Sequence, residues 1–202
     1  IIANVDISAA CKQHVELNSD ITVVYHTGKL PEKSSEKMLV KVGDDNRITG
    51  ITFDAAAGEA SFGIGVTIIN SVLLLEMIKD ALDEGITNFA RAVLANKTGE
   101  LKMYGFEHKE YVAVMDNTAT YYEANMDLLG DNPNFDVTDS NWKIQSRSPL
   151  APPHFIGEGA KTYNSIVMSG CEVYGTVENS VLASDVTVCK GAIVKNSIIM
   201  AD

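Results

Sequence analysis

The sequence is poor in the residues on which several protein classes depend. It has three cysteines in 202 residues, and Cys11, Cys171 and Cys189 are too few and too scattered for a disulfide framework. We therefore predict reduced thiols without an internal disulfide, and a cytoplasmic protein. No apolar run approaches the roughly 18 residues of a membrane span, and the first residues lack the basic segment of a signal peptide.

Basic side chains are also scarce. Sixteen Lys and Arg residues stand against 27 Asp and Glu, which gives a formal charge of -11. A surface of this sign repels nucleic acid and acidic membranes, so small molecules and other proteins remain as partners. The histidines His14, His26, His108 and His154 lie far apart in the sequence, and no pair has metal-ligand spacing. We therefore expect no zinc site.

A repeat stands out near the end of the sequence. The phrases "NSIV", "NSVL" and "NSII" begin at Asn164, Asn179 and Asn196, at intervals of 15 and 17 residues. Between them run six-residue units with an aliphatic first position and mostly small or turn-forming residues at the fourth, such as "VYGTVE" and "LASDVT". This pattern predicts a triangular solenoid of short strands with Asn and Ser at its corners. An antiparallel sandwich is the alternative, but it does not require hexads.

The first 145 residues predict a different, α/β architecture. Asp6 can cap a helix that reaches about residue 17, and "ITVVY" then begins a strand. "MLVKV", "GDDN" and "RITGITF" predict a hairpin. "SFGIGVTIIN" predicts a strand, followed by a helix with Ser71 as its cap and Gly85 as its stop. The polar, proline-containing segment from 131 to 153 predicts a linker. Trp142 and Ile144 are expected to pack this linker against a neighbouring domain.

The phrases "YYEANMDLL", "NWKI", "PP" and "IGEGAKTYNSIVMSGCEVYGTVENSVL" together carry a resemblance over nearly the whole chain. The sequence resembles bacterial ADP-glucose pyrophosphorylase, the glucose-1-phosphate adenylyltransferase of glycogen synthesis. The resemblance implies part of a Rossmann-like nucleotidyltransferase domain at 1–145, a linker at 146–153, and the start of a left-handed parallel β-helix at 154–202. With fewer than three coils expected, both ends look truncated, and the last coil looks uncapped or covered by something else.

That family transfers an adenylyl group from ATP to glucose 1-phosphate with Mg²⁺, and it uses a Gly-rich basic loop for the triphosphate. This chain contains no Gly-Gly pair and no such loop. Residue by residue, Asp54 stands where the family has a phosphate-binding Lys, and Val114 stands where it has a metal-binding Asp. Asp116 is an alternative for the latter. Ser61 and Gly63 match a strand that touches the sugar.

These replacements make the chain similar to the non-catalytic, regulatory subunit found in Gram-positive bacteria. The resemblance implies no catalytic or metal-binding residue and no cofactor in this chain, with a catalytic subunit or a second copy as partner. We expect the aliphatic residues of the last coil to lie near a self-association contact; these are Ile193, Val194, Ile198 and Ile199.

Three other functions stay open at the sequence level. An active nucleotidyltransferase would need its ATP loop outside this chain. A hexapeptide acyltransferase would need a histidine general base, and none follows His154. A pure interaction module needs neither. Tyr121 and Tyr122 are expected to pack a helix against the sheet as core residues, and the segment 29–37, "KLPEKSSEK", is expected to be a solvated loop between strands.

Overall fold

A computed structural model describes residues 1–30, 35–55, 57–86, 88, 90–131, 133–137, 139–140, 143–144 and 150–201. The chain forms two compact units, Ile1–Asp116 and Asn117–Asp202. The first half of the linker predicted at 146–153, residues 146–149, lies outside the described residues, as does Trp142, and the linker remains a prediction. None of the described helices has the length and apolar character needed to cross a membrane.

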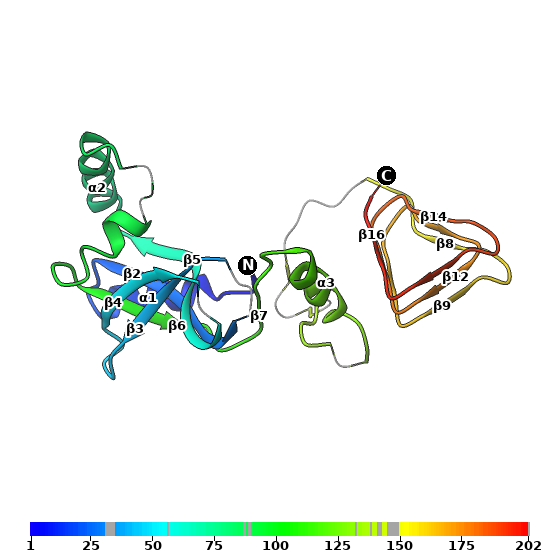
Figure 1. Cartoon of the computed structure of the whole chain (residues 1–202), viewed down its shortest axis with the longest axis horizontal. Helices are drawn as coiled ribbons and strands as arrows, with labels where there is room; N and C mark the ends of the chain where they lie inside the picture. Colours follow the sequence, from blue (N-terminus) through cyan, green and yellow to red (C-terminus); the bar gives the residue numbers. More distant parts are fainter. Residues whose placement is uncertain are drawn as a thin grey trace. The chain divides into compact units, whose positions relative to one another are not determined.

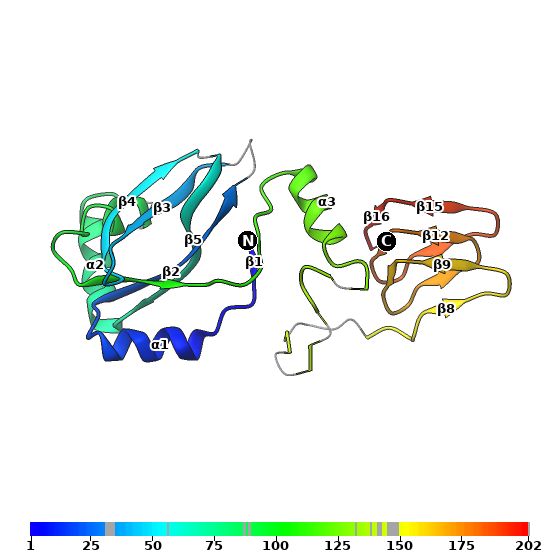
Figure 2. The ribbon, with the colours of Figure 1, turned by 90° about the horizontal axis from the view of Figure 1, so that it is seen from below.

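The first unit is built on a five-stranded mixed sheet with the strand order β4-β3-β5-β2-β6, and Figure 2 shows β4, β3, β5 and β2 next to one another in this order. β2 and β6 are parallel, whereas the other neighbours in this sheet are antiparallel. A separate antiparallel ribbon joins β1 to β7. The predicted mixed α/β class is therefore confirmed. The strands are β1 (Ile2–Ala3), β2 (Ile21–Leu30), β3 (Lys37–Val42), β4 (Ile48–Asp54), β5 (Gly58–Ile69), β6 (Met103–Glu107) and β7 (Val112–Ala113).

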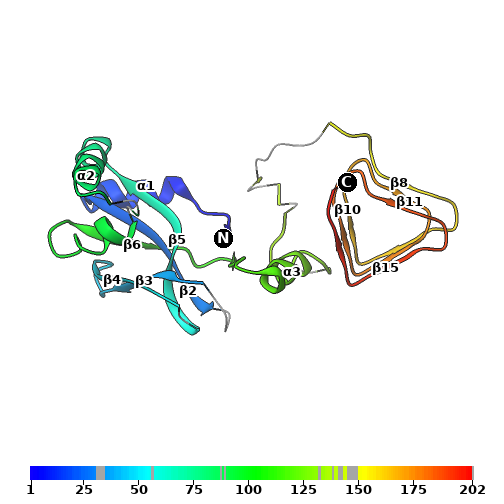
Figure 3. The same ribbon diagram turned by 45° about the horizontal axis from the view of Figure 1, so that its top comes forward.

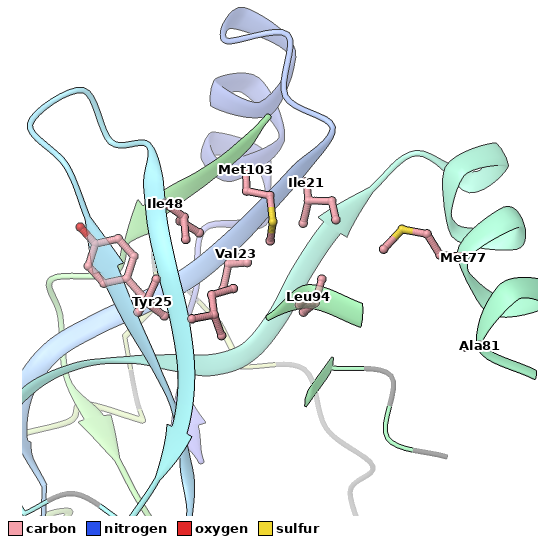
Figure 4. Close-up of a cluster of buried hydrophobic side chains, with 10 residues drawn as sticks. Ile21, Val23, Tyr25, Ile48, Met77, Ala81, Leu94 and Met103 are labelled. Atoms are coloured by element: carbon pink, nitrogen blue, oxygen red, sulfur yellow. The ribbon is translucent and has the colours of Figure 1, made fainter. Parts of the chain in front are cut away.

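Apolar side chains cover both faces of this sheet because successive residues of a strand point to opposite sides. On one face, Ile21 and Val23 belong to a first core that also contains Met77 of helix α2 (Ser71–Asp83) and Leu94 of the π-helical turn η1 (Ala90–Leu94) (Figure 4). On the other face, a second core contains Val24 of β2, Phe62 of β5 and Ala10, which belongs to helix α1 (Ile7–Glu16). Burial of the sheet on both faces explains why the first half of β2 is a nearly continuous run of apolar residues.

Local sequence signals fix the ends of the helices. The Asp6 carboxylate accepts a hydrogen bond from the Ala9 N–H at 2.9 Å, as predicted for the cap of α1. Helix α2 is different: Asn70, not Ser71, is its cap, because Asn70 accepts from the Val72 N–H and Ser71 is already helical. Gly85 follows α2 with a φ of +69°, which is the left-handed conformation that glycine adopts without strain.

The second unit begins with helix α3 (Thr118–Met126) and continues into a parallel β-helix. The nine strands described in this unit form three parallel three-stranded sheets, β8-β11-β14, β9-β12-β15 and β10-β13-β16 (Figures 1, 2 and 3). Three complete coils are therefore present, and the expectation of fewer than three was wrong. The difference arises because some turns are shorter than a full hexad, so the 45 residues from Phe155 to Ile199 form three coils. The strands are β8 (Phe155–Ile156), β9 (Lys161–Tyr163), β10 (Ile166–Val167), β11 (Glu172–Val173), β12 (Thr176–Glu178), β13 (Val181–Leu182), β14 (Thr187–Val188), β15 (Ile193–Lys195) and β16 (Ile198–Ile199).

The three Asn-Ser phrases form ladders along one corner of the β-helix. Asn164, Asn179 and Asn196 have φ values of +43°, +49° and +47°, which asparagine tolerates better than other residues with side chains. The Asn164 amide donates to Asn179 Oδ1 and the Asn179 amide donates to Asn196 Oδ1, both at 2.7 Å. The backbone N–H groups of Ser180 and Ser197 donate to the serine hydroxyl of the preceding coil at 3.1 Å. The repeated phrase therefore turns the chain and joins successive coils.

Most of the aliphatic residues that open the hexads point into the coils. Val173, Leu182 and Val188 belong to the buried core of the β-helix, with Val167 and Val194 packed against it. Cys171 is fully buried in this core, and its thiol contacts the Ala183 carbonyl oxygen at 2.9 Å. Cys11 and Cys189, by contrast, are exposed.

This difference in burial predicts the order of thiol reactivity. In the native chain, Cys11 and Cys189 should react with a thiol reagent at rates near that of a small free thiol, whereas Cys171 should react only after the β-helix opens. Mass spectrometry of alkylated peptides under native and denaturing conditions measures both. The prediction of no internal disulfide is tested in the same samples, since a peptide bridging residues 171 and 189 would contradict it.

Candidate functional site

A buried ion pair lies at one end of the sheet of the first unit. Lys37 Nζ is 2.6 Å from Asp116 Oδ2, and the two side chains are only 8% and 12% exposed. The Ser35 N–H donates to the same carboxylate oxygen at 3.0 Å, and the Lys37 ammonium also donates to the Ser35 hydroxyl at 2.7 Å. Removing these charges from water is costly, so the pair must be held together by good geometry.

The position of Lys37 follows from strand alternation. Lys37 opens β3, where Met38 packs against the first core and Leu39 against the second. Lys37 therefore points to the side of the second core, where Asp116 lies just after β7. The expectation that the segment 29–37 is entirely a solvated loop was wrong at both of its ends. Lys37 belongs to β3 and is buried, and Lys29 belongs to β2.

Val114 is part of the second core and is buried beside Val24, Phe62 and Ile64. A methyl-bearing side chain among apolar neighbours offers no oxygen to a hard cation such as Mg²⁺. Two residues further on, the Asp116 carboxylate is paired with an ammonium group, which opposes a cation at the same oxygen. Within the described ranges, no three His, Cys, Asp or Glu side chains come together as a metal site. These residues do not fit a magnesium ion.

Asp54 ends β4 directly opposite Lys37 in the antiparallel register of β3 and β4. Its side chain is exposed, and its Oδ1 accepts from the Ala55 N–H at 2.8 Å. A carboxylate at this place repels a phosphate group. The cation on the neighbouring strand is committed to Asp116, so this end of the sheet presents no free ammonium group from Lys37.

Ser61 and Gly63 lie on β5, on either side of Phe62. Because Phe62 belongs to the second core, Ser61 and Gly63 face the opposite side of the sheet. The Ser61 hydroxyl is 2.8 Å from that of Thr27, and a Cβ on Gly63 would overlap the Met38 side chain. The structure thus brings Asp54, Val114 and Asp116 to one side of the sheet and leaves Ser61 and Gly63 on the other.

Sequence spacing did not reveal that two histidines are neighbours. His26 on β2 and His108, which follows β6, have ring centroids 6.5 Å apart. His26 Nδ1 is 2.7 Å from the His108 carbonyl oxygen and therefore carries the hydrogen of that bond. The parallel pairing of β2 with β6 joins residues more than 80 positions apart, so no local pattern could have indicated the pair.

The aromatic residues of α3 have partners in the second unit. The Tyr122 hydroxyl donates to the Asn196 carbonyl oxygen at 3.1 Å, and the Tyr121 hydroxyl contacts Met200 Sδ at 3.3 Å. Both contacts are with the last coil of the β-helix, and Tyr122 is 37% exposed. The expectation that these tyrosines pack the helix against the sheet as core residues was therefore wrong.

The fold and the site define a protein with a mixed α/β unit followed by a hexapeptide β-helix. Residues 152–202 match the family model described as GlmU-like, C-terminal hexapeptide. Over more of its length, the chain is related to glucose-1-phosphate adenylyltransferases. It is 36% identical over 137 residues to the protein of that name from Thermosipho melanesiensis. This match covers 67% of this chain and 33% of the relative.

Two clostridial proteins of the same name extend the comparison. The one from Clostridium perfringens is 36% identical over 140 residues, covering 68% of this chain and 36% of the relative. The one from Clostridium novyi is 30% identical over 199 residues, covering 96% of this chain and 51% of the relative. The chain thus spans about half the length, or less, of these curated relatives.

Proposed function

We propose that this chain acts in glycogen biosynthesis as a regulatory or assembly subunit of glucose-1-phosphate adenylyltransferase and has no catalytic activity of its own. The observation that carries this proposal is the Lys37–Asp116 ion pair beside a buried Val114. At the aligned position of the family's metal-binding Asp, the chain has a core residue. The alternative carboxylate, that of Asp116, is neutralised by the ammonium group of Lys37 in the same chain.

The chemistry of adenylyl transfer explains why these changes matter. The reaction transfers an adenylyl group from ATP to glucose 1-phosphate with release of pyrophosphate. Both substrates are polyanionic, so charge stabilisation by cations supplies much of the rate enhancement. With Asp54 in place of the aligned Lys, the sugar phosphate meets a negative charge. Without a carboxylate at 114, a metal ion loses a ligand. Either change alone weakens catalysis. With both changes, the chain keeps the fold of the enzyme but not the groups that catalyse the reaction.

A scaffold of this kind acts through contacts with other subunits. We propose a catalytic glucose-1-phosphate adenylyltransferase subunit as the partner, in the cytoplasm, with self-association of the chain as a second mode. The exposure of Ile193 supports a contact surface near this residue, since an aliphatic side chain that is 73% exposed favours association. Val194, Ile198 and Ile199 of the same coil are half-buried.

The test is an activity assay with purified components. The chain alone, with ATP, Mg²⁺ and glucose 1-phosphate, should release no ADP-glucose above a blank. The relative from Thermosipho melanesiensis should be active in parallel. Adding the chain to a catalytic subunit from its own source should change that subunit's rate or its response to effectors.

Two results would contradict the proposal. One is turnover by the chain alone that survives repurification and is lost in Asp116→Asn, because it would make Asp116 a functional metal ligand. The other is the absence of any change in a catalytic subunit of the same source at a saturating concentration of this chain, because it would remove the regulatory role.

A further inference from the structure

Two aromatic side chains and one carboxylate gather on the outer face of the sheet β8-β11-β14. Phe155 and Glu172 are direct partners in the parallel register of β8 and β11, and Tyr174 follows two residues after Glu172 on the same side. Phe155 is 52% exposed and Tyr174 is 40% exposed. Their ring centroids are 5.9 Å apart, with the ring planes inclined by 54°. The two rings thus form an open, angled surface.

The arrangement is held in place by the chain itself. The Tyr174 hydroxyl donates to Glu172 Oε2 at 3.0 Å, which fixes the carboxylate beside the rings and raises the pKa of Tyr174, chiefly through this hydrogen bond. The Tyr174 ring lies over Gly157, where an added Cβ would stand 2.6 Å from the ring carbon Cδ1. A side chain at 157 would therefore displace the Tyr174 ring.

Among the described residues, no guanidinium group is found over the rings of this surface. In the described part of the chain, the contacts of a guanidinium with an aromatic ring are made elsewhere, by Arg47 on Tyr104 and by Arg91 on Phe53. Glu172 has the Tyr174 hydroxyl as its side-chain partner among these residues.

Arg91 shows within this protein how one arginine can contact an aromatic ring and a carboxylate together. Its guanidinium carbon lies 5.9 Å from the centre of the Phe53 ring, while its Nη1 donates to both carboxylate oxygens of Glu36 at 2.7 and 2.8 Å. One arginine thus satisfies an aromatic face and a carboxylate at once. Phe155, Tyr174 and Glu172 offer the same two kinds of group.

We propose that the surface formed by Phe155, Glu172 and Tyr174 binds the guanidinium group of an arginine presented by a partner protein. The rings attract a planar cation through their electron-rich faces, and the fixed carboxylate adds a charge-assisted hydrogen bond. The formal charge of -11 favours a basic partner for this surface. This proposal does not depend on the catalytic status of the chain.

The probe is N-acetyl-argininamide, titrated into the full, isotope-labelled chain and followed by the backbone amide resonances of residues 155, 172 and 174. N-acetyl-citrullinamide, which has a similar shape without the charge, is the ligand control. Arginine should give saturable shifts confined to this face, and citrulline should give none. Equal shifts from the two ligands, or shifts scattered over both units, would overturn the proposal.

Three variants test the individual groups. Glu172→Gln should weaken binding about two- to fivefold, because it removes the charge but keeps the shape. Tyr174→Phe, which releases the carboxylate, and Gly157→Ala, which displaces the ring, should each weaken it as well. Tyr163→Phe changes an exposed tyrosine on another sheet, and Glu76→Gln changes an exposed glutamate on α2, so both should bind as the wild type does.

Unchanged binding in Glu172→Gln, with the spectrum otherwise native, would contradict the proposal. If these resonances instead move with protein concentration alone, the occupant is a second copy and the inference of a basic partner protein is wrong.

Discussion

Replacing Lys37 by methionine is expected to destabilise the first unit by about 3 to 5 kcal/mol, because the Asp116 carboxylate is then left buried without its counter-ion. Methionine keeps the length and apolar stem of lysine, so the loss reports the charge rather than a cavity. Hydrogen exchange measured by mass spectrometry gives the opening free energy of β2 and β5 separately from that of the β-helix.

The same experiment has a matched control and a rescue. Lys12→Met removes a lysine from an exposed i,i+4 pair with Glu16, so it should change stability by less than about 1 kcal/mol. In the double variant Lys37→Met/Asp116→Asn, most of the lost stability should return, because asparagine still accepts from the Ser35 N–H without a buried charge. A loss in Lys37→Met no greater than in Lys12→Met would mean that the pair is not buried in solution.

Replacing Leu182 by alanine is expected to destabilise the β-helix by about 2 to 5 kcal/mol. Leu182 is fully buried in the central coil, in register with Val167 on one side and Ile199 on the other. Because each coil of a solenoid contacts only its neighbours, a defect in the middle coil weakens the packing of both others. Amide exchange should therefore accelerate in all three coils and stay unchanged in the first unit.

Ile193→Ala is the control for this variant, since it also shortens an aliphatic side chain in the β-helix but at an exposed position. Its effect should stay within about 0.5 kcal/mol. A similar loss in both variants, or a Leu182→Ala effect confined to one coil, would show that the coils do not share one cooperative core.

The β-helix was predictable because its signal is local and repeated. The aliphatic residue that opens each hexad must face the interior of a narrow coil, so the hexad pattern alone indicates Val173, Leu182 and Val188 as core residues. The number of coils was not predictable in the same way. It depends on how many residues each turn uses, and turns of unequal length can close the same triangle.

The candidate site was predictable only in part. Aligning the sequence with a family pattern drew attention to Asp54, Val114 and Asp116. It could not show that Val114 packs into a core, or that a lysine 79 residues away occupies the carboxylate of Asp116. Nor could it show that Ser61 and Gly63 face the other side of the sheet, since facing depends on which neighbours each side of β5 meets.

By itself, the sequence determined the two architectures and the corner residues, because hexad period, strand alternation and the preference of Asn for positive φ act over a few residues. Only the tertiary structure decided the partners of the charged and aromatic side chains: Lys37 with Asp116, His26 with His108, and Phe155 with Tyr174. Such contacts join distant segments through the pairing of strands. A sequence specifies that pairing through the burial of the whole core, and not through any one short stretch.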